Sequence, residues 1–370
     1  MQFMAAAAFG LEGVVKQELT ALGFEAKAEQ GGARFEADWT GALRANIHLA
    51  CADRVLLVLG EAEVTSFEAL FEFVLGLPFE SFLPRDAAFP VSGNCVRSQL
   101  MSVSDCQRIT KKAIAQRLKR SYRLDWFPET GSLYPVNITI HRDRARVTLD
   151  TSGEALNKRG YRTWVGEAPL RETLAAALVR LSPWRGDQML YDPCCGSGTL
   201  LVEAAFLAQN RAPGLSRSFA MDTWAHADQA AMQEVRQQAR AAWRRDTPLN
   251  IAGSDIDERA LDLCRRHLRQ AGLADRITVR QMDLEQVRLQ EGPVCFVTNP
   301  PYGERLGDRK KAAGVAAALG RLLKRHPGAS LSAITADPGF EAQAKKRAAS
   351  RRRLYNGRLE CEYLTFMNEG

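Results

Sequence analysis

The sequence lacks a long apolar segment and lacks the paired cysteines of a metal site. The first fifteen residues, MQFMAAAAFGLEGVV, carry no basic segment, and Glu12 interrupts their apolar run, so we expect no secretion signal and no membrane span. The eight cysteines are scattered, and the one close pair, Cys194 and Cys195, is adjacent rather than spaced as Cys-x-x-Cys. We therefore expect no metal site, no disulfide framework, no membrane partner, and a reducing, cytoplasmic location.

Chain length and net charge limit the number of domains and the kinds of partner. A chain of 370 residues allows two or three domains at about 100 to 200 residues each. Hydrophobic residues make up 46% and charged residues 25%, which predicts a chain that buries a core. Lysine and arginine outnumber aspartate and glutamate by 50 to 43. That net charge of +7 suits a polyanionic partner where the excess is clustered.

The hydrophobic pattern changes twice along the chain and predicts three domains. Residues 1–60 combine the helical pattern LEGVVKQELTALG with short strand-like runs, which is typical of a small α+β domain. Residues 61–153 form a second α+β unit that ends in PVNITIHRDRARVTLD, a hairpin with its turn at RDR. In residues 154–370 strands and helices alternate, which predicts an α/β domain with a mostly parallel, doubly wound sheet. It closes with an antiparallel hairpin, predicted as a type I′ turn at Asn356-Gly357.

Three successive strand ends in the third domain carry glycine or an acid. LYDPCCGSGTLLVEAA places Gly196 and Gly198 between a strand and a helix, either as a plain structural turn or as a backbone that approaches a ligand closely. Asp255 ends the next strand, where an acid can accept ribose hydroxyls, and Asp283 ends the third, where it can accept an adenine amino group. Each acid alone is equally explained as a solvated loop residue or a helix cap. The long interval from Gly198 to Asp255 argues against a nicotinamide fold.

The fourth strand ends in FVTNPPYGER. An exocyclic amine of a nucleobase is a poor nucleophile because its lone pair is delocalised into the ring. The side-chain oxygen of Asn299 and the carbonyl of Pro300 can accept its N–H groups as charge develops. Pro300 and Pro301 fix the backbone, and Tyr302 can stack on a base taken out of its helix. We interpret Asn299, Pro300, Pro301 and Tyr302 as catalytic; the alternative is a proline turn with Tyr302 in the core.

The stretches DPCCGSGT and NPPY resemble the class I S-adenosylmethionine-dependent methyltransferases that act on nucleobase amines. The resemblance implies S-adenosylmethionine as the cofactor, with Asp192 and the glycine loop around its methionine part, Asp255 at the ribose, and Asp283 at the adenine. Ile256 would pack against the adenine ring. The full implied set is Leu170, Thr173, Asp192, Gly196, Ser197, Gly198, Thr199, Asp255, Ile256, Asp283 and Asn299.

More narrowly, LDTSGEALNKRGYR, APLRETLAAALV, SDID, NPPYGERL and YNGRLECEY resemble the THUMP-containing RNA methyltransferases. They are closest to the bacterial branch that includes the amino-terminal half of the large-subunit ribosomal RNA guanine-N2 methyltransferase. The resemblance implies a ferredoxin-like domain at 1–60, a THUMP RNA-binding domain at 61–153 and a Rossmann-like methyltransferase domain at 154–370. It also implies structured RNA, 23S rRNA, as partner and guanine N2 as target. Two alternatives stay open: an N6-adenine methyltransferase on RNA or DNA, and a non-catalytic RNA-binding ribosome-assembly factor.

The charge excess concentrates in CQRITKKAIAQRLKRSYR, within the second domain. Such a run is either a solvated helix face or a track for RNA phosphates, and beside a base-modifying pocket we favour the second. The candidate RNA-binding residues are Arg108, Lys111, Lys112, Arg117, Lys119 and Arg120. Gly160-Tyr161-Arg162 could extend this track. The segment 211–248 carries no assigned role.

Overall fold

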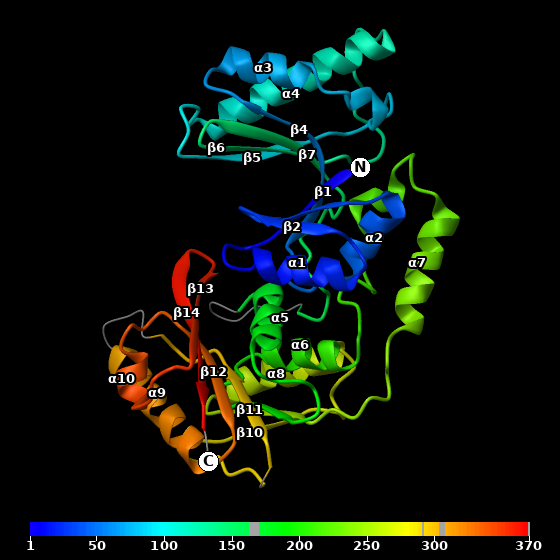
Figure 1. The fold of residues 1–370 in the computed structure, drawn as a ribbon. Coiled ribbons are helices and arrows are strands. Elements are labelled where there is room, and N and C mark those ends of the chain that lie inside the picture. Colours follow the sequence, from blue (N-terminus) through cyan, green and yellow to red (C-terminus); the bar gives the residue numbers. More distant parts are fainter. Residues whose placement is uncertain (163–169, 291, 303–307, 369–370) are drawn as a thin grey trace. The chain divides into compact units, whose positions relative to one another are not determined.

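The computed structural model describes residues 1–162, 170–290, 292–302 and 308–368 (Figure 1). The chain divides into two compact units. The first comprises Met1–Ala7, Val15–Leu156 and Arg217–Gln238, and the second Ala8–Val14, Asn157–Ser216 and Ala239–Gly370. Helix α1 (Glu12–Ala21) is therefore shared between the two.

One seven-stranded sheet runs through the first unit in the order β2-β3-β1-β4-β7-β6-β5. Its strands are β1 (Gln2–Ala6), β2 (Ala26–Glu29), β3 (Gly32–Glu36), β4 (Arg54–Glu63), β5 (Val91–Val96), β6 (Val136–His141) and β7 (Arg144–Asp150). Strand β4 pairs antiparallel with β1 on one side and with β7 on the other. Because β4 crosses the expected boundary at residue 60, the ferredoxin-like and THUMP segments share a sheet.

Helices of the first unit begin where the sequence supplies caps. Asp38, Ser66 and Ser102 accept backbone N–H groups at the starts of α2 (Trp39–His48), α3 (Phe67–Leu75) and α4 (Val103–Tyr122). In β6, Val136, Ile138 and Ile140 are buried and alternate with more exposed residues, as the period-two pattern predicts. The hairpin turn between β6 and β7 is Arg142-Asp143, and both residues have positive φ, which is the type I′ geometry.

The segment that the sequence left unassigned belongs partly to this first unit. It contains the short helix η2 (Ala220–Thr223) and most of α7 (Gln229–Ala241). The Trp224 ring stacks on Tyr134 at 4.8 Å and meets Trp39 edge-on at 5.7 Å, and its Nε1 donates to the Leu133 carbonyl at 2.8 Å. Residues 217–238 therefore belong to the amino-terminal unit, with Trp224 buried in it, although they interrupt the methyltransferase segment in sequence.

The second unit contains the predicted mostly parallel sheet, in the order β10-β9-β8-β11-β12-β14-β13. Its strands are β8 (Met189–Asp192), β9 (Ile251–Asp255), β10 (Thr278–Gln281), β11 (Val294–Thr298), β12 (Ser330–Thr335), β13 (Ser350–Asn356) and β14 (Leu359–Met367). Strands β8 to β12 are parallel, and β14 runs antiparallel to both β12 and β13. The predicted α/β class with a terminal antiparallel hairpin is confirmed.

Helices cover this sheet from both sides. Figure 1 shows α5 (Glu172–Leu181), α6 (Thr199–Ala208) and α8 (Glu258–Gln270) on one side and α9 (Asp308–Arg325) and α10 (Phe340–Ala344) on the other. Because parallel strands end at the same edge, the tips of β8, β9, β10 and β11 lie together. In the part of the chain that the structure describes, no helix is long and apolar enough to cross a membrane.

The turn of the terminal hairpin differs from the prediction. Asn356 pairs with Leu359, so the two-residue loop is Gly357-Arg358, and of these two only Gly357 has positive φ. A type I′ turn at Asn356-Gly357 is therefore wrong, because it needs positive φ at both loop residues. The hairpin itself is present.

Candidate cofactor and substrate site

The glycine loop between β8 and α6 is a tight turn whose two glycines differ. Gly198 N donates to the Cys195 carbonyl at 2.8 Å, and both Gly196 and Gly198 have positive φ. A Cβ added at Gly198 would lie 2.4 Å from Cys264 Sγ, whereas one added at Gly196 would meet nothing within 4 Å. Gly198 therefore allows α8 to pack against the loop, and Gly196 exposes its backbone to open space.

Asp255, at the end of β9, connects this loop to the next strand tip. Its Oδ2 accepts from Gly196 N at 2.8 Å, and its Oδ1 accepts from Asp257 N at 3.0 Å. Each carboxylate oxygen has two lone pairs, so both can still accept a ribose hydroxyl. Ile256 follows at 68% exposure, an unusual position for an isoleucine and one that a flat apolar ring could cover.

Asp192 is the buried carboxylate of the site. Its side chain is 1% exposed, and its Oδ1 accepts from Cys194 N at 3.1 Å. Burial, with a smaller contribution from the charge of Asp255, raises the pKa of Asp192 to about 7. Asp192 therefore gains or loses a proton near neutral pH and is sensitive to a cation placed beside it.

Asp283 serves as a cap. It is exposed after β10, and its Oδ1 accepts from Glu285 N at 2.8 Å at the start of the short helix η3 (Leu284–Gln286). Oδ1 of Asp283 therefore acts as a helix cap, which is one of the alternatives considered above for this residue. The cap orients the carboxylate at the third strand tip, where the cofactor assignment had placed it.

The fourth strand tip brings an amide and a phenol into contact. Strand β11 is buried along its whole length, and Asn299 follows it at intermediate exposure. The Tyr302 hydroxyl donates to Asn299 Oδ1. Pro300 is buried and Pro301 is exposed, so the first proline anchors the turn and the second faces solvent. Residues 303–307 lie outside the described residues.

A cavity of 590 Å³ lies at these strand ends. It brings together six of the predicted residues: Leu170, Asp192, Gly196, Ser197, Thr199 and Asn299. It also has walls that the sequence did not indicate: Cys194, Cys195, Leu200, Asp257, Arg259, Ala260 and Leu263. Leu200 lies in the first turn of α6, Arg259 and Ala260 lie in the first turn of α8, and Asp257 caps α8. The order strand, acid, helix start in SDIDERAL was the signal that could have found Asp257 and Arg259.

Some predicted residues lie elsewhere. Thr173 is 4% exposed inside α5 and does not line the cavity. Gly198, Asp255, Ile256 and Asp283 do not line it either, although Asp255 holds the glycine loop. The cavity therefore corresponds to the methionine end of the predicted cofactor site, and the predicted ribose and adenine contacts lie outside it.

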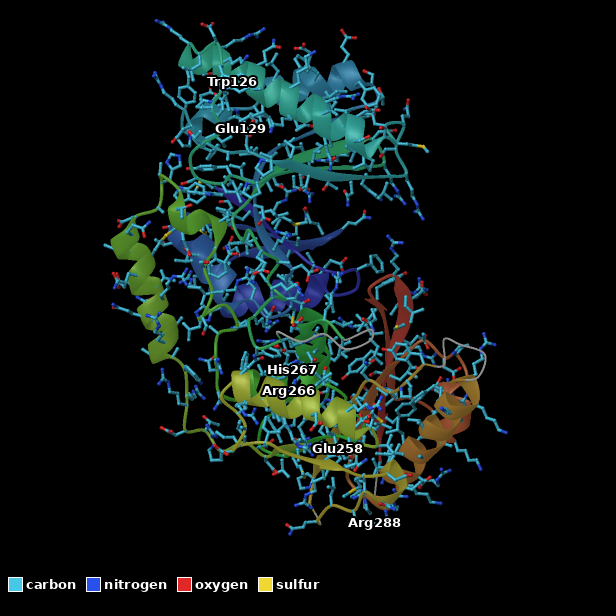
Figure 2. The ribbon with its side chains drawn as sticks, turned by 180° about the vertical axis from the view of Figure 1, so that it is seen from behind. Trp126, Glu129, Glu258, Arg266, His267 and Arg288 are labelled. Atoms are coloured by element: carbon cyan, nitrogen blue, oxygen red, sulfur yellow. The ribbon has the colours of Figure 1, made fainter. Side chains whose placement is uncertain are left out.

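The predicted RNA helix is α4, and half of its candidate cations are paired with acids. Arg108 pairs with Asp105 at 2.5 Å, Lys111 with Glu129 at 3.0 Å, and Arg117 with Glu80. Figure 2 shows Glu129 beside α4 and Trp126, 76% exposed, at its end. Lys112 lies over the Phe71 ring. Within the described part of the chain, Lys112, Lys119 and Arg120 form no ion pair; Lys112 and Arg120 are exposed, and Lys119 is half-buried.

The basic sequence around Tyr161 is buried rather than presented to a partner. Arg159 pairs with Glu203 at 2.6 Å with both side chains 1% exposed, and the Tyr161 hydroxyl donates to Glu203 at 2.7 Å. Arg162 pairs with Glu172 at 3.3 Å. Burial raises the pKa of Glu203 to about 7. Tyr161 and Arg162 therefore do not extend an RNA track, because the first side chain is buried against α6 and the second against α5.

Comparison with known families covers almost the whole chain. Residues 2–56 match the RlmL ferredoxin-like domain, residues 64–150 the THUMP domain, and residues 159–365 the RMKL-like methyltransferase domain. The fold and the strand-tip site define a class I S-adenosylmethionine-dependent methyltransferase. With its two amino-terminal domains, the chain belongs to the THUMP-containing class I RNA methyltransferases.

Individual relatives agree with this assignment. The chain is 39% identical over 368 residues to the Bacillus subtilis (strain 168) protein "Putative RNA methyltransferase YpsC", covering 99% of this chain and 96% of the relative. A Listeria monocytogenes structure described as a "predicted N6-adenine-specific DNA methylase" is 42% identical, with a TM-score of 0.93 over 99% and 96% of the two chains. SMU.472, "a putative methyltransferase complexed with SAH", is 36% identical, with a TM-score of 0.93 over 100% and 98%.

The chain is thus an S-adenosylmethionine-dependent methyltransferase of nucleic acid, and the residues present fit that cofactor. The Gly196 backbone faces open space, a buried carboxylate at Asp192 lines the cavity, and an exposed apolar side chain at Ile256 follows Asp255. Sulfonium and ammonium groups need a nearby anion, and an adenine ring needs an apolar surface.

Proposed function

We propose that this enzyme methylates an exocyclic base amine in structured RNA, most specifically N2 of a guanine in 23S rRNA. The observation that carries the proposal is Asn299, whose side-chain oxygen lies at the end of β11 and whose side chain lines the 590 Å³ cavity. An amide oxygen beside a methyl-donor site is suited to a substrate N–H group, since it accepts hydrogen bonds and carries no charge that would repel or trap the product.

S-adenosylmethionine supplies an electrophilic methyl group on a sulfonium. In the proposed mechanism, Asn299 Oδ1 and the Pro300 carbonyl accept the two N–H groups of the target amine, which draws its lone pair out of conjugation and toward the methyl carbon. Tyr302 already donates to Asn299 Oδ1, and the second lone pair of that oxygen remains for the substrate. The N–CH3 bond forms as the S–CH3 bond breaks, and the amine then releases one proton.

The other cofactor contacts hold the methyl donor in place. Asp192 in its ionised form attracts the cationic methionine end. Asp255 keeps Gly196 N in position and can accept ribose hydroxyls at the same time. Asp283 and Ile256 are the adenine contacts. Because these groups sit at the ends of rigid strands, they are aligned before the substrate arrives, which lowers the entropy cost of reaching the transition state.

RNA as the partner is supported by the THUMP match at residues 64–150 and by α4 within it. Lys119 and Arg120, which form no ion pair among the described residues, suit phosphates. Trp126, at the end of the same helix, offers an exposed ring on which a base can stack.

A second candidate is methylation of adenine N6, because adenine also presents an exocyclic amine to the same amide. The Listeria relative, described as a predicted N6-adenine-specific DNA methylase, is the specific observation that favours it. Tyr302 stacks equally well on either purine, so the site alone does not choose between them.

Product identification separates these candidates. The enzyme is incubated with labelled S-adenosylmethionine and either rRNA lacking its own modifications or DNA, and the product is digested to nucleosides. We expect label in N2-methylguanosine from rRNA. Label in N6-methyladenosine would keep the chemistry and replace the substrate, and label in neither nucleic acid would overturn the proposed function.

A further inference from the structure

A groove of 420 Å³ lies on the catalytic sheet away from the cavity described above. Its floor is formed by β8, β9 and β10, the three strands whose tips carry Asp192, Asp255 and Asp283. Its volume is within the range of sites that hold one small ligand or one nucleotide-sized group. None of its lining residues belongs to the catalytic group at residues 299–302.

The part of this face formed by β9 and β10 is open, because the described residues between β10 and β11 supply no full helix to cover it. Between the end of β10 at Gln281 and the start of β11 at Val294, the only helix among the described residues is η3, three residues long. A Cβ at Gly253 would meet Leu201 of α6 at 3.0 Å, so Gly253 points to the helix-covered face. Its neighbour Ala252 must then point to the other face, and its register partners Tyr191 and Thr278 share that face.

Three arginines surround the groove, and none of its lining residues is acidic. Arg276 donates to the Thr247 carbonyl at 2.6 Å, and Arg288 donates to the Glu285 carbonyl at 2.7 Å. Arg280 is exposed on β10, and Arg288 lies at the lower edge of the view in Figure 2. Across the described residues, no carboxylate forms an ion pair with any of the three. Backbone carbonyls orient two of these guanidinium groups but do not neutralise them.

The floor between the arginines is apolar. Met189, Ala252, Met282 and Leu289 are only partly buried, although they pack against the main core of this unit. A groove with uncompensated guanidinium groups around an apolar floor suits a ligand that is anionic at its edge and flat and apolar at its centre. Guanidinium groups match phosphate oxygens in a two-pronged geometry that lysine does not offer.

We propose that this groove binds a single-stranded segment of the RNA substrate, with phosphates at Arg276, Arg280 and Arg288 and a base against Met189 and Met282. A single strand is required because a duplex keeps its base faces stacked and would leave the apolar floor uncovered. This inference rests on the proposed RNA substrate and adds a second contact surface, on the methyltransferase unit itself, beyond α4.

The test compares two exposed arginines of the same unit. Arg280→Gln removes a charge from the groove, and Arg269→Gln removes one from the last turn of α8, outside the groove. Binding of a labelled single-stranded oligouridylate is measured by fluorescence anisotropy over a range of salt. We expect Arg280→Gln to weaken binding roughly two- to tenfold and to reduce the slope of log K against log salt by about 0.7, the value for one phosphate contact on a single strand.

Steady-state kinetics with unmodified rRNA should show the same pattern, with KM for RNA raised and kcat unchanged in Arg280→Gln. Arg288→Gln is a second groove variant, and melting curves check that both fold. Equal affinity and equal salt slope in wild type, Arg280→Gln and Arg269→Gln would overturn the proposal. So would weakened binding of an acidic peptide with RNA binding intact, which would assign the groove to a protein partner.

The oligouridylate measurement does not depend on methyl transfer. If the enzyme labels no RNA while Arg280→Gln still weakens oligouridylate binding, the proposed function is contradicted, but RNA binding in the groove is supported. If Arg280→Gln methylates rRNA with wild-type kinetics, RNA binding in the groove is contradicted, but the proposed function is supported.

Discussion

The strand tips of the second unit and helix α4 of the first unit are both rich in functional residue types, but their interactions differ. At the strand tips, the polar groups engage near neighbours and the loop backbone: Asp192 holds Cys194 N, and Asp283 holds Glu285 N. On α4, two of the three paired cations engage acids much farther along the chain, Glu80 for Arg117 and Glu129 for Lys111. The first arrangement builds a site, while the second pairs half of the candidate cations with acids.

The comparison explains why a motif can be interpreted more securely than a charge run. A strand-tip motif carries its own geometry, because the strand, the turn and the following helix fix where each side chain points. A run of lysine and arginine shows only where charge could be. Whether that charge is available depends on acids that only the tertiary structure brings near.

The largest expected effect is at the catalytic strand tip. Asn299→Ala removes the amide oxygen that we propose accepts the substrate N–H, and we expect kcat to fall by about 100-fold or more, the loss typical of deleting one preorganised hydrogen-bonding group. Affinity for S-adenosylmethionine, measured by calorimetry, should change little. A variant with near wild-type turnover would show that the amide is not part of the chemistry. The matched control is Asn356→Ala, a half-buried asparagine at the end of β13 that lines neither the cofactor cavity nor the groove at Arg280.

The two glycines of the loop should separate stability from binding. Gly198→Ala places a methyl group against Cys264 and forces an L residue into positive φ, so we expect a loss of about 2–4 kcal/mol in the free energy of unfolding. Gly196→Ala has open space and should cost only about 1–2 kcal/mol from its backbone conformation, but it places the added methyl group on the loop that we propose contacts the cofactor. Denaturant unfolding and cofactor calorimetry on both variants check this; equal losses of stability would contradict the distinct roles assigned to the two glycines.

The pKa of Asp192 gives a pH dependence with a defined sign. Its folded value of about 7 lies above the ordinary 3.8, so the folded chain keeps a proton that the unfolded chain releases between these values. Stability from this group is therefore complete below pH 3.8 and is lost as pH rises toward 7.

Cofactor binding should follow the opposite trend, because the ionised carboxylate is the form that attracts the cationic methionine end. We expect affinity for S-adenosylmethionine to rise about tenfold between pH 6 and pH 8, and Asp192→Asn to remove most of that rise. Calorimetry at the two pH values measures it. An Asp192→Asn variant with the full wild-type pH dependence would assign the effect to another group.

The smallest expected effect is on α4, where paired and unpaired cations can be compared within one helix. Lys119→Gln should weaken RNA binding roughly twofold and lower its salt slope by somewhat less than one. Arg117→Gln should act mainly through stability, because it leaves Glu80 without the partner that lowers the pKa of that carboxyl. Filter binding and melting curves check the pair. If Arg117→Gln weakens RNA binding more than Lys119→Gln does, the ion pair with Glu80 opens when RNA binds.

Much of the fold was predictable because its signals are local. The alternation of strands and helices after Pro183 predicted the parallel sheet, and the Arg142-Asp143 turn lies inside the RDR stretch expected to make it. The single sheet of the first unit was not predictable. The sequence pattern of β4 predicts a strand, but it does not indicate which strands pair with it. Nor was the position of Trp224, because its partners Trp39 and Tyr134 lie 185 and 90 residues away in the sequence.

The candidate site shows the same limit. Asp192, Gly196 and Asn299 could be named from the sequence because they lie at the end of a strand or in the turn that follows it. The roles of Thr173 and Arg162 could not, because a side chain on a helix or in a connector is buried or exposed according to what packs over it. Thr173 lies inside α5, and Arg162 pairs with Glu172. The open groove at Arg280 had no sequence signal beyond the short interval between β10 and β11.

The most direct test of the central claim uses the target amine itself. Two transcripts of the same 23S rRNA region are prepared, one normal and one with inosine in place of guanosine, and methyl transfer from labelled S-adenosylmethionine is measured on both. Inosine lacks the exocyclic amine at position 2 of the ring and is otherwise the same base. The account predicts label in the guanosine transcript and none in the inosine transcript. Equal label in both would contradict guanine N2 as the acceptor.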